Sequence, residues 1–203
     1  MHACTRWAAQ VTLAIANVGL AGCATPAPDY LATPDHVAQL KRSGAAPTHV
    51  SFVATQPGLP GARFLKVRTQ QMRSPTGFDF GDYVAAALRT ELQAAQLDNP
   101  ASATEITGTL VQNQLDASGV KHDDGSMDVR FMVTRGPLVV FDKVKSVTYQ
   151  WPGTADNTAA IPGALRGYTA MVRALMASLI ADPDFIAALT VPSSSQAGSS
   201  SAE

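Results

Sequence analysis

The stretch that most constrains the fold lies between Met127 and Thr134, where apolar residues occupy every second position. Side chains on a β-strand point alternately to its two faces, so this period predicts a strand with one buried face and one solvated face. The residues expected to face the core are Met127, Val129, Phe131 and Val133.

Two further strands are expected on either side of this one. Ile106 to Leu115 precedes it, and Leu138 to Trp151, dense in Val, Phe and Tyr, follows the turn signal Gly136-Pro137. The polar connection from 116 to 126 contains Asp124-Gly125, a dipeptide typical of hairpin turns. The pattern predicts three strands in an antiparallel meander.

Two shorter strands are expected nearer the N-terminus, at His49 to Val53 and Phe64 to Arg68. Gln56 to Gly61, with two prolines and two glycines, separates them. The surrounding stretch, Arg63 to Arg73, is the most basic part of the chain. A solvated edge strand is the favoured interpretation, since charge on edge strands prevents aggregation, and a site for an anionic ligand is the alternative.

Helical periodicity appears twice at length. Asp82 to Gln96 carries apolar residues at three- and four-residue spacing, and a second long helix is expected from Pro162 onward. Short helices are expected after Thr33 and after Asp182, each followed by proline. These elements predict an α+β fold, a two-layer sandwich in which two main helices pack on one face of a mostly antiparallel sheet.

The N-terminus carries a different signal. A short apolar segment ends in Leu20, Ala21, Gly22 and Cys23, which resembles the lipobox of bacterial lipoproteins. A membrane-spanning helix would need about 20 apolar residues, and this segment is shorter. The resemblance implies that the Cys23 thiol receives diacylglycerol, that the chain is cleaved before it, and that its amine is acylated, for instance with palmitate. Ala24 after the cysteine implies the outer membrane, facing the periplasm.

We therefore expect four segments along the chain. They are a lipoprotein signal peptide (1–22), a lipidated tether and short helix (23–47), a single α+β domain (48–190) and a disordered tail rich in Ser and Ala (191–203). Cys4 would be removed and Cys23 acylated, which leaves no thiol for catalysis or metal binding. The net charge of −1 gives no electrostatic case for nucleic acid.

Residue patterns for catalysis or cofactors are weak. His122-Asp123-Asp124 is the one cluster of imidazole and carboxylate, and it lacks the ligand spacing of a calcium loop. The chain has neither a G-x-S-x-G motif nor a phosphate-binding glycine loop. We expect no enzyme, no cofactor and no metal site. Candidate contacts with a partner are Trp151, a residue type enriched in binding hot spots, and Arg166 and Arg173, seven residues apart.

Several short stretches together resemble one group of proteins. Gly81-Asp82-Tyr83-Val84 begins a helix, Glu105 to Leu110 reads EITGTL, and Asp182 to Leu189 reads DPDFIAAL. Over roughly residues 48 to 190 the chain resembles YajG-like uncharacterised outer-membrane lipoproteins and, more distantly, LptE-like and ABC-transport-auxiliary small lipoproteins. The resemblance implies a periplasm-facing protein of the cell envelope without catalysis, and it supplies no binding residues.

Three classes of function remain open. The leading one is a non-catalytic lipoprotein, attached to the membrane through the lipid on Cys23, that binds an envelope protein or supports envelope assembly. The second is a transport accessory that binds lipid or a small apolar ligand between sheet and helices. The third is a hydrolase, which would require a distant carboxylate to approach His122.

Overall fold

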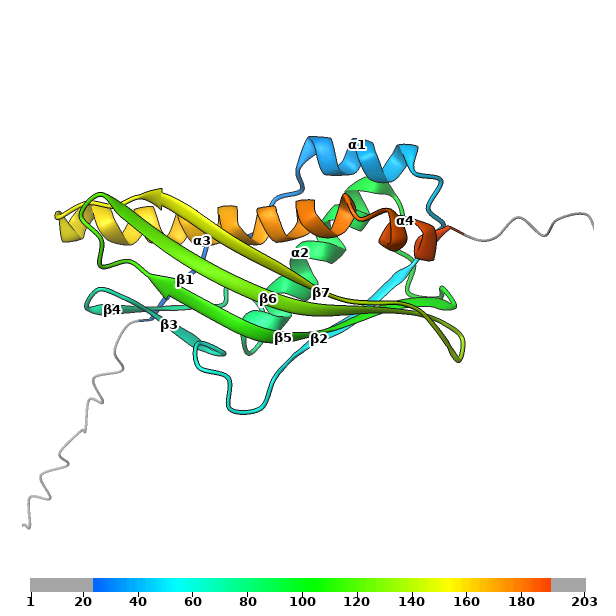
Figure 1. The fold of residues 1–203 in the computed structure, drawn as a ribbon, viewed down its shortest axis with the longest axis horizontal. Coiled ribbons are helices and arrows are strands. Elements are labelled where there is room, and N and C mark those ends of the chain that lie inside the picture. The colour runs from blue at the N-terminus through cyan, green and yellow to red at the C-terminus, as the bar shows by residue number, and fades with distance from the viewer. Residues whose placement is uncertain (1–23, 191–203) are drawn as a thin grey trace, which may run out of the picture.

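The computed structural model describes residues 24–190, and within them the chain forms four helices and seven strands (Figure 1). The α+β class is confirmed. In chain order the elements are β1 (Ala24–Pro26), α1 (Pro34–Arg42), β2 (His49–Thr55), β3 (Phe64–Val67), β4 (Gln70–Arg73), α2 (Phe80–Ala95), β5 (Thr104–Asp116), β6 (His122–Arg135), β7 (Leu138–Pro152), α3 (Asn157–Ile180) and α4 (Pro183–Leu189).

The strands form two sheets. The large sheet has the order β2-β5-β6-β7, and the small sheet has the order β1-β4-β3. The predicted meander is confirmed, because β5, β6 and β7 pair antiparallel. Both sheets are nevertheless mixed rather than mostly antiparallel, since β2 runs parallel to β5 and β1 parallel to β4. A parallel neighbour needs a crossover, and α2 provides it between β2 and β5.

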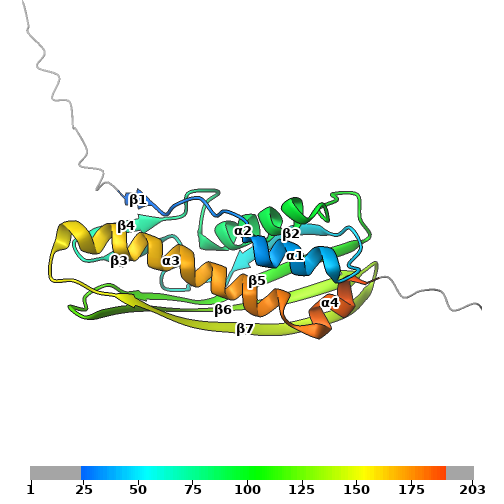
Figure 2. The same cartoon turned by 90° about the horizontal axis from the view of Figure 1, so that it is seen from above.

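The core lies between the large sheet and the helices. α2 packs over β2 and β5, and α3 packs over β6 and β7. The four residues predicted to face inward from β6 are all fully buried, which confirms the period-two interpretation: Met127, Val129, Phe131 and Val133. Figure 2 shows α1 lying beside α2 and α3, outside this layer.

Helix ends follow their capping residues. The Asp79 carboxylate accepts hydrogen bonds from the backbone N–H groups of Gly81 and Asp82, so α2 begins close to the predicted position. Asp182 caps α4 as expected. α3 begins five residues before Pro162, because Asp156 accepts from the N–H of Thr158 and fixes an earlier start.

Asp124-Gly125 does not form the predicted hairpin turn. Both residues lie within β6, and residues 117–121 make the connection instead. Gly125 is required for packing, because a Cβ atom there would lie 3.0 Å from the Met171 sulfur of α3 and 3.1 Å from the Gln114 carbonyl oxygen. Gly125 therefore allows α3 to pack closely against the sheet, and it does not form a turn.

The segment expected as a tether packs on the rest of the structure. Ala24–Pro26 pairs with β4, and Ala27 and Tyr30 are buried. Glu91, fully buried on α2, accepts hydrogen bonds from the Tyr30 hydroxyl at 2.5 Å and from the Thr33 N–H at 3.1 Å, and contacts His36 Nδ1 at 2.9 Å. These bonds hold the segment and α1 against α2.

The predicted signal peptide with its lipobox, and the predicted tail, lie outside the described residues. The division of the chain at residues 47 and 190 stays a prediction.

Candidate functional site

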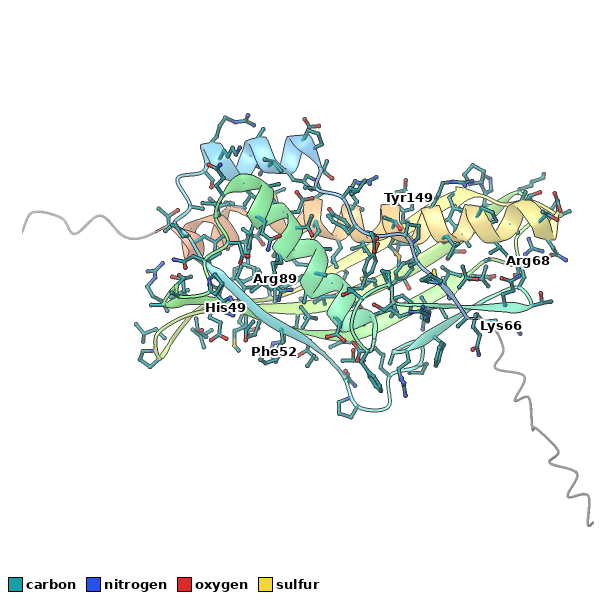
Figure 3. The ribbon with its side chains drawn as sticks, turned by 180° about the vertical axis from the view of Figure 1, so that it is seen from behind. His49, Phe52, Lys66, Arg68, Arg89 and Tyr149 are labelled. Atoms are coloured by element: carbon teal, nitrogen blue, oxygen red, sulfur yellow. The ribbon has the colours of Figure 1, made fainter. Side chains whose placement is uncertain are left out.

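The large sheet has one face that the described residues leave uncovered, and we take it as the candidate contact surface. Alternate side chains of β5, β6 and β7 point away from the helices and are partly or fully exposed. Figure 1 looks onto this face, with α2 behind the strands, and Figure 3 gives the opposite view with α2 in front. We call this surface the outer face. Its middle consists of residues in two cross-strand rows: Phe52, Thr107, Met132 and Asp142, and Ala54, Thr109, Arg130 and Val144.

Apolar exposure on the outer face is unusual for residues of these types. Phe52 is 53% exposed and Val144 is 53% exposed, and Val139, near the β6–β7 turn, is 57% exposed. Phe52 lies on the edge strand β2, and Val139 and Val144 lie on the opposite edge strand β7, so exposed apolar side chains stand at both edges of this face. Exposed apolar surface on one sheet face can mark a binding surface.

The charges in the middle of the outer face cancel locally. Arg130 donates two hydrogen bonds to the Asp142 carboxylate, at 2.6 Å and 2.5 Å. The hydrogen bonds from Arg130 lower the pKa of Asp142, and those same bonds raise the pKa of Arg130. Because both groups are exposed, the pair adds little stability, but it leaves this part of the sheet neutral.

Phe52 reaches this face because β2 contains a bulge. The register shifts between Val50 and Phe52, so both Val50 and Val53 are buried while Phe52 points outward. Arg89 of α2 donates to the carbonyl oxygen of Val50 at 2.9 Å and stabilises the irregular backbone (Figure 3). Strict alternation from Val50 would have placed Phe52 inward, so its exposure could not be predicted from the residue pattern.

Two of the three predicted contact residues lie together. Trp151, at the end of β7, and Arg166 of α3 line a surface hollow of about 270 Å³ with Tyr149 and Gly167. Trp151 is only 7% exposed, and its ring stacks toward Tyr149 with centroids 6.5 Å apart. The indole therefore closes the end of the core, and it offers a partner little surface.

Arg173 lies elsewhere on α3. Its charge acts on the buried hydroxyl groups of Tyr30 and Tyr83. Burial raises the pKa of Tyr83, and Arg173 partly opposes that shift. The seven-residue spacing of Arg166 and Arg173 thus does not place both beside Trp151.

The His122-Asp123-Asp124 cluster is divided between two faces of β6. His122 and Asp124 are exposed, whereas Asp123 is buried and accepts a hydrogen bond from the Gly119 N–H at 2.9 Å. Asp123 therefore fixes the β5–β6 connection. Within residues 24–190, no three His, Cys, Asp or Glu side chains gather in a way that could hold a metal ion.

Glu91 is a fully buried carboxylate that was not predicted from the sequence. It follows Ala87 by four residues and Leu88 by three, so it lies on the buried stripe of α2. A carboxylate at that spacing was the available signal, because a buried charge needs partners from elsewhere in the chain.

Two larger hollows lie outside the space that α2 and α3 enclose against the large sheet. One, of about 460 Å³, opens between β3 and the adjoining ends of β5 and β6. Another of about 460 Å³ lies between β7 and α4, beside Phe141 and Lys143.

No helix within the described part of the chain is long and apolar enough to cross a membrane. Cys23, Leu20, Ala21 and Gly22 lie outside that part.

Comparison with known proteins finds similarity in fold but not in sequence. No family model matches the chain, and no curated protein matches it by sequence. The crystal structure of protein XCC0632 from Xanthomonas campestris, of the family DUF330, is similar with a TM-score of 0.57 at 10% identity, over 81% of this chain and 96% of that chain. A Caulobacter crescentus protein provisionally described as a lipoprotein gives 0.41 at 12% identity, over 72% and 90% of the two chains. The chain thus shares an α+β fold with the Xanthomonas protein.

Proposed function

We propose that this protein is a lipoprotein, anchored in the outer membrane through Cys23, that acts without catalysis by binding a protein partner in the periplasm. The outer face of the large sheet is the binding surface in this proposal. The observation that carries it is the exposure of Phe52, Val139 and Val144 on a sheet face that no described helix covers.

The chemistry of the outer face defines the kind of partner. Arg130 and Asp142 neutralise each other, and Thr107 and Thr109 supply hydroxyl groups between the apolar side chains. A partner surface that is itself uncharged and apolar at its centre fits this pattern, because burying an unpaired charge against it would be costly. The anchor is supported by the Leu20–Cys23 sequence.

A role in binding an apolar ligand has weaker support. The hollow beside Trp151 does lie between β7 and α3, but its volume of about 270 Å³ is slightly below the ~300 Å³ at which small-molecule sites begin. The residues between α2, α3 and the sheet are almost all fully buried.

Site-specific crosslinking in the native host tests the proposal. A photo-crosslinking residue at Phe52 and, separately, at Val144 should capture the same envelope protein, while the same residue at Arg42, exposed on α1, should not capture it. The double variant Phe52→Asp, Val144→Asp should lose the captured protein and fail to complement a deletion strain, while its stability in urea changes little.

The anchor and the catalytic alternative are tested in the same strain. Cys23→Ala should abolish acylation, release the protein from membranes and abolish complementation. His122→Ala combined with Asp124→Ala should complement fully. Complementation by the Asp double variant of the outer face, or its loss in the His122 variant, would overturn the contact proposal.

A further inference from the structure

The small sheet lies where the described chain begins. Ala24 pairs with Gln71 of β4, which in turn pairs with Lys66 of β3, so the three residues form one row across the sheet. Cys23 is the residue immediately before Ala24. Consecutive Cα atoms are about 3.8 Å apart, so a lipid on Cys23 would be held close to the edge of this sheet. Figure 3 labels Lys66 on the same part of the fold.

The two faces of the small sheet differ in chemistry. Leu65, Val67 and Met72 point inward and are buried. Phe64, Lys66 and Arg73 point outward and are exposed. The amphipathic pattern thus presents aromatic and basic side chains on the side away from the core.

A second exposed aromatic residue, Phe78, and Arg63 extend this outward side. The Arg63 guanidinium lies 3.7 Å from the centroid of the Phe78 ring and 5.8 Å from that of Phe64. Phe64 is 45% exposed and Phe78 is 67% exposed. We define the basic–aromatic face as the following residues: Arg63, Phe64, Lys66, Arg73 and Phe78.

The cations of this face are available to a ligand. Among the described residues, none of Arg63, Lys66 and Arg73 forms an ion pair, and Arg73 donates only to the adjacent Ser74 carbonyl. Arg68 is not part of the face, because it donates to the Gly119 and Thr154 carbonyl oxygens.

Acidic residues limit the extent of the basic–aromatic face. Asp116 and Asp124 line the groove beside Lys66, and Asp82 accepts a hydrogen bond from the Phe78 N–H. The attraction of the face for an anionic surface is therefore confined to its three cations. Such a face binds weakly alone and becomes effective when a second attachment holds it at high local concentration.

We propose that the basic–aromatic face lies against an anionic phospholipid surface, and that it orients the domain on the membrane that holds the Cys23 lipid. This inference rests on the lipid anchor of the proposed function. Lys and Arg near an anionic bilayer each add roughly fivefold to binding, and aromatic side chains prefer the membrane–water interface. A lipid headgroup layer is the proposed partner of this face, because the acylated Cys23, one residue before β1, would lie in that layer.

The test uses the acylated full chain, purified and reconstituted in vesicles of phosphatidylethanolamine with phosphatidylglycerol. Gln71→Cys places a fluorophore on the outward side of the small sheet without removing a charge. Leu138→Cys, at the β6–β7 turn, is the control, because Figure 1 places that turn at the opposite end of the long axis from β1. Because Cys4 is predicted to be removed and Cys23 to be acylated, each variant has one reactive thiol for the fluorophore.

A quencher attached to lipid should dim the Gln71 label severalfold more than the Leu138 label. Charge reversal at Arg63, Lys66 and Arg73 to Glu should abolish this difference. The milder pair Lys66→Gln and Arg73→Gln, which leaves packing intact, should lower the binding of the unanchored Cys23→Ala protein to the same vesicles roughly 25-fold, from the loss of two cations.

The outcomes separate the inference from the anchor. A chain without acyl groups overturns the anchor and this assignment with it. An acylated chain whose two labels are quenched equally overturns this assignment alone. The Gln71 label can also be compared in neutral phosphatidylcholine vesicles and in the anionic vesicles. If it is quenched equally in both, the tether alone holds the sheet near the membrane, and the charge-based assignment is overturned.

Discussion

The indole ring of Trp151 lies directly against the backbone of Gly167, so that a Cβ atom at Gly167 would overlap the ring carbons Cδ2, Cε2 and Cε3. β7 and α3 meet at this point, and the contact closes one end of the core. The glycine is therefore required by its neighbour, although glycine is otherwise unfavourable inside a helix.

Gly167→Ala should lower the free energy of unfolding by about 1–3 kcal/mol, the usual range for overpacking a core. Gly163→Ala is the matched control, because nothing lies within 4 Å of a Cβ atom there and the residue belongs to the same helix. It should raise the free energy of unfolding by about 0.5–1 kcal/mol. Urea denaturation of both variants measures this, and equal effects would contradict the packing of Trp151 on α3.

Phe131→Ala and Met132→Ala test the faces of β6. Phe131 is fully buried, whereas Met132 is partly exposed on the outer face. The first change should cost ~3–5 kcal/mol and the second much less. Denaturant melts in which Met132→Ala is the more damaging change would show that the strand faces are exchanged.

Asp182 should make the protein sensitive to acid. Burial opposes its ionisation, but hydrogen bonds from Lys145, Lys143 and the Asp184 N–H outweigh burial and hold the pKa of Asp182 below its ordinary value of 3.8. A lowered folded-state pKa gives stability that is present above the unfolded pKa and is lost as the pH falls through the folded pKa.

Asp182→Asn keeps a side-chain acceptor for the α4 cap and removes the charge. It should cost about 1–3 kcal/mol above roughly pH 5, and its difference from wild type should shrink toward roughly pH 2. Asp142→Asn, in the exposed pair with Arg130, should change little at any pH. Denaturation followed against pH measures both, and a difference that grows on acidification would contradict the ion-pair assignment.

Tyr30→Phe tests the attachment of residues 24–33. Burial, followed by the hydrogen bond to Glu91, raises the pKa of Tyr30 well above its ordinary value of 10.0. The stability from this bond is therefore fully present below about pH 10 and is lost as the pH rises toward the folded pKa. At neutral pH the variant should speed hydrogen exchange at the Thr33 amide, which also donates to Glu91.

The control for that measurement is Tyr149→Phe, on β7. It should leave exchange in residues 24–33 unchanged. If Tyr30→Phe also left it unchanged, the Glu91 bonds would not be what holds this segment.

Local patterns were enough to predict the elements whose burial follows a regular period. The inward residues of β6 and the apolar stripe of α2 are examples, since each is set by the geometry of a single element. The parallel pairing of β2 with β5 could not be predicted from local patterns. It depends on the path of the chain between these two strands, which runs through β3, β4 and α2. The turn predicted at Asp124-Gly125 was wrong, because the packing of Gly125 against Met171 outweighs the turn preference of this dipeptide.

The candidate site was less accessible from sequence. Trp151 and Arg166 do share a hollow, but Phe52 depends on a bulge and on the hydrogen bond from Arg89, two features with no local signature. Of the β3–β4 hairpin, the first strand was predicted at Phe64 to Arg68, but β4 and the turn were missed. Its strands have four residues each, and it turns through Arg68 with a positive φ of 57°, a conformation that arginine rarely adopts.

The parallel pairing of β1 with β4 has a mechanical consequence. A force applied at Ala24 along β1 would load its hydrogen bonds to β4 in shear, so that they must break together rather than one after another. Behind them, the Tyr30 and Thr33 bonds to Glu91 would carry the load into α2. Tension on the N-terminus would thus pull on the folded body as a whole before it peeled the leading segment away.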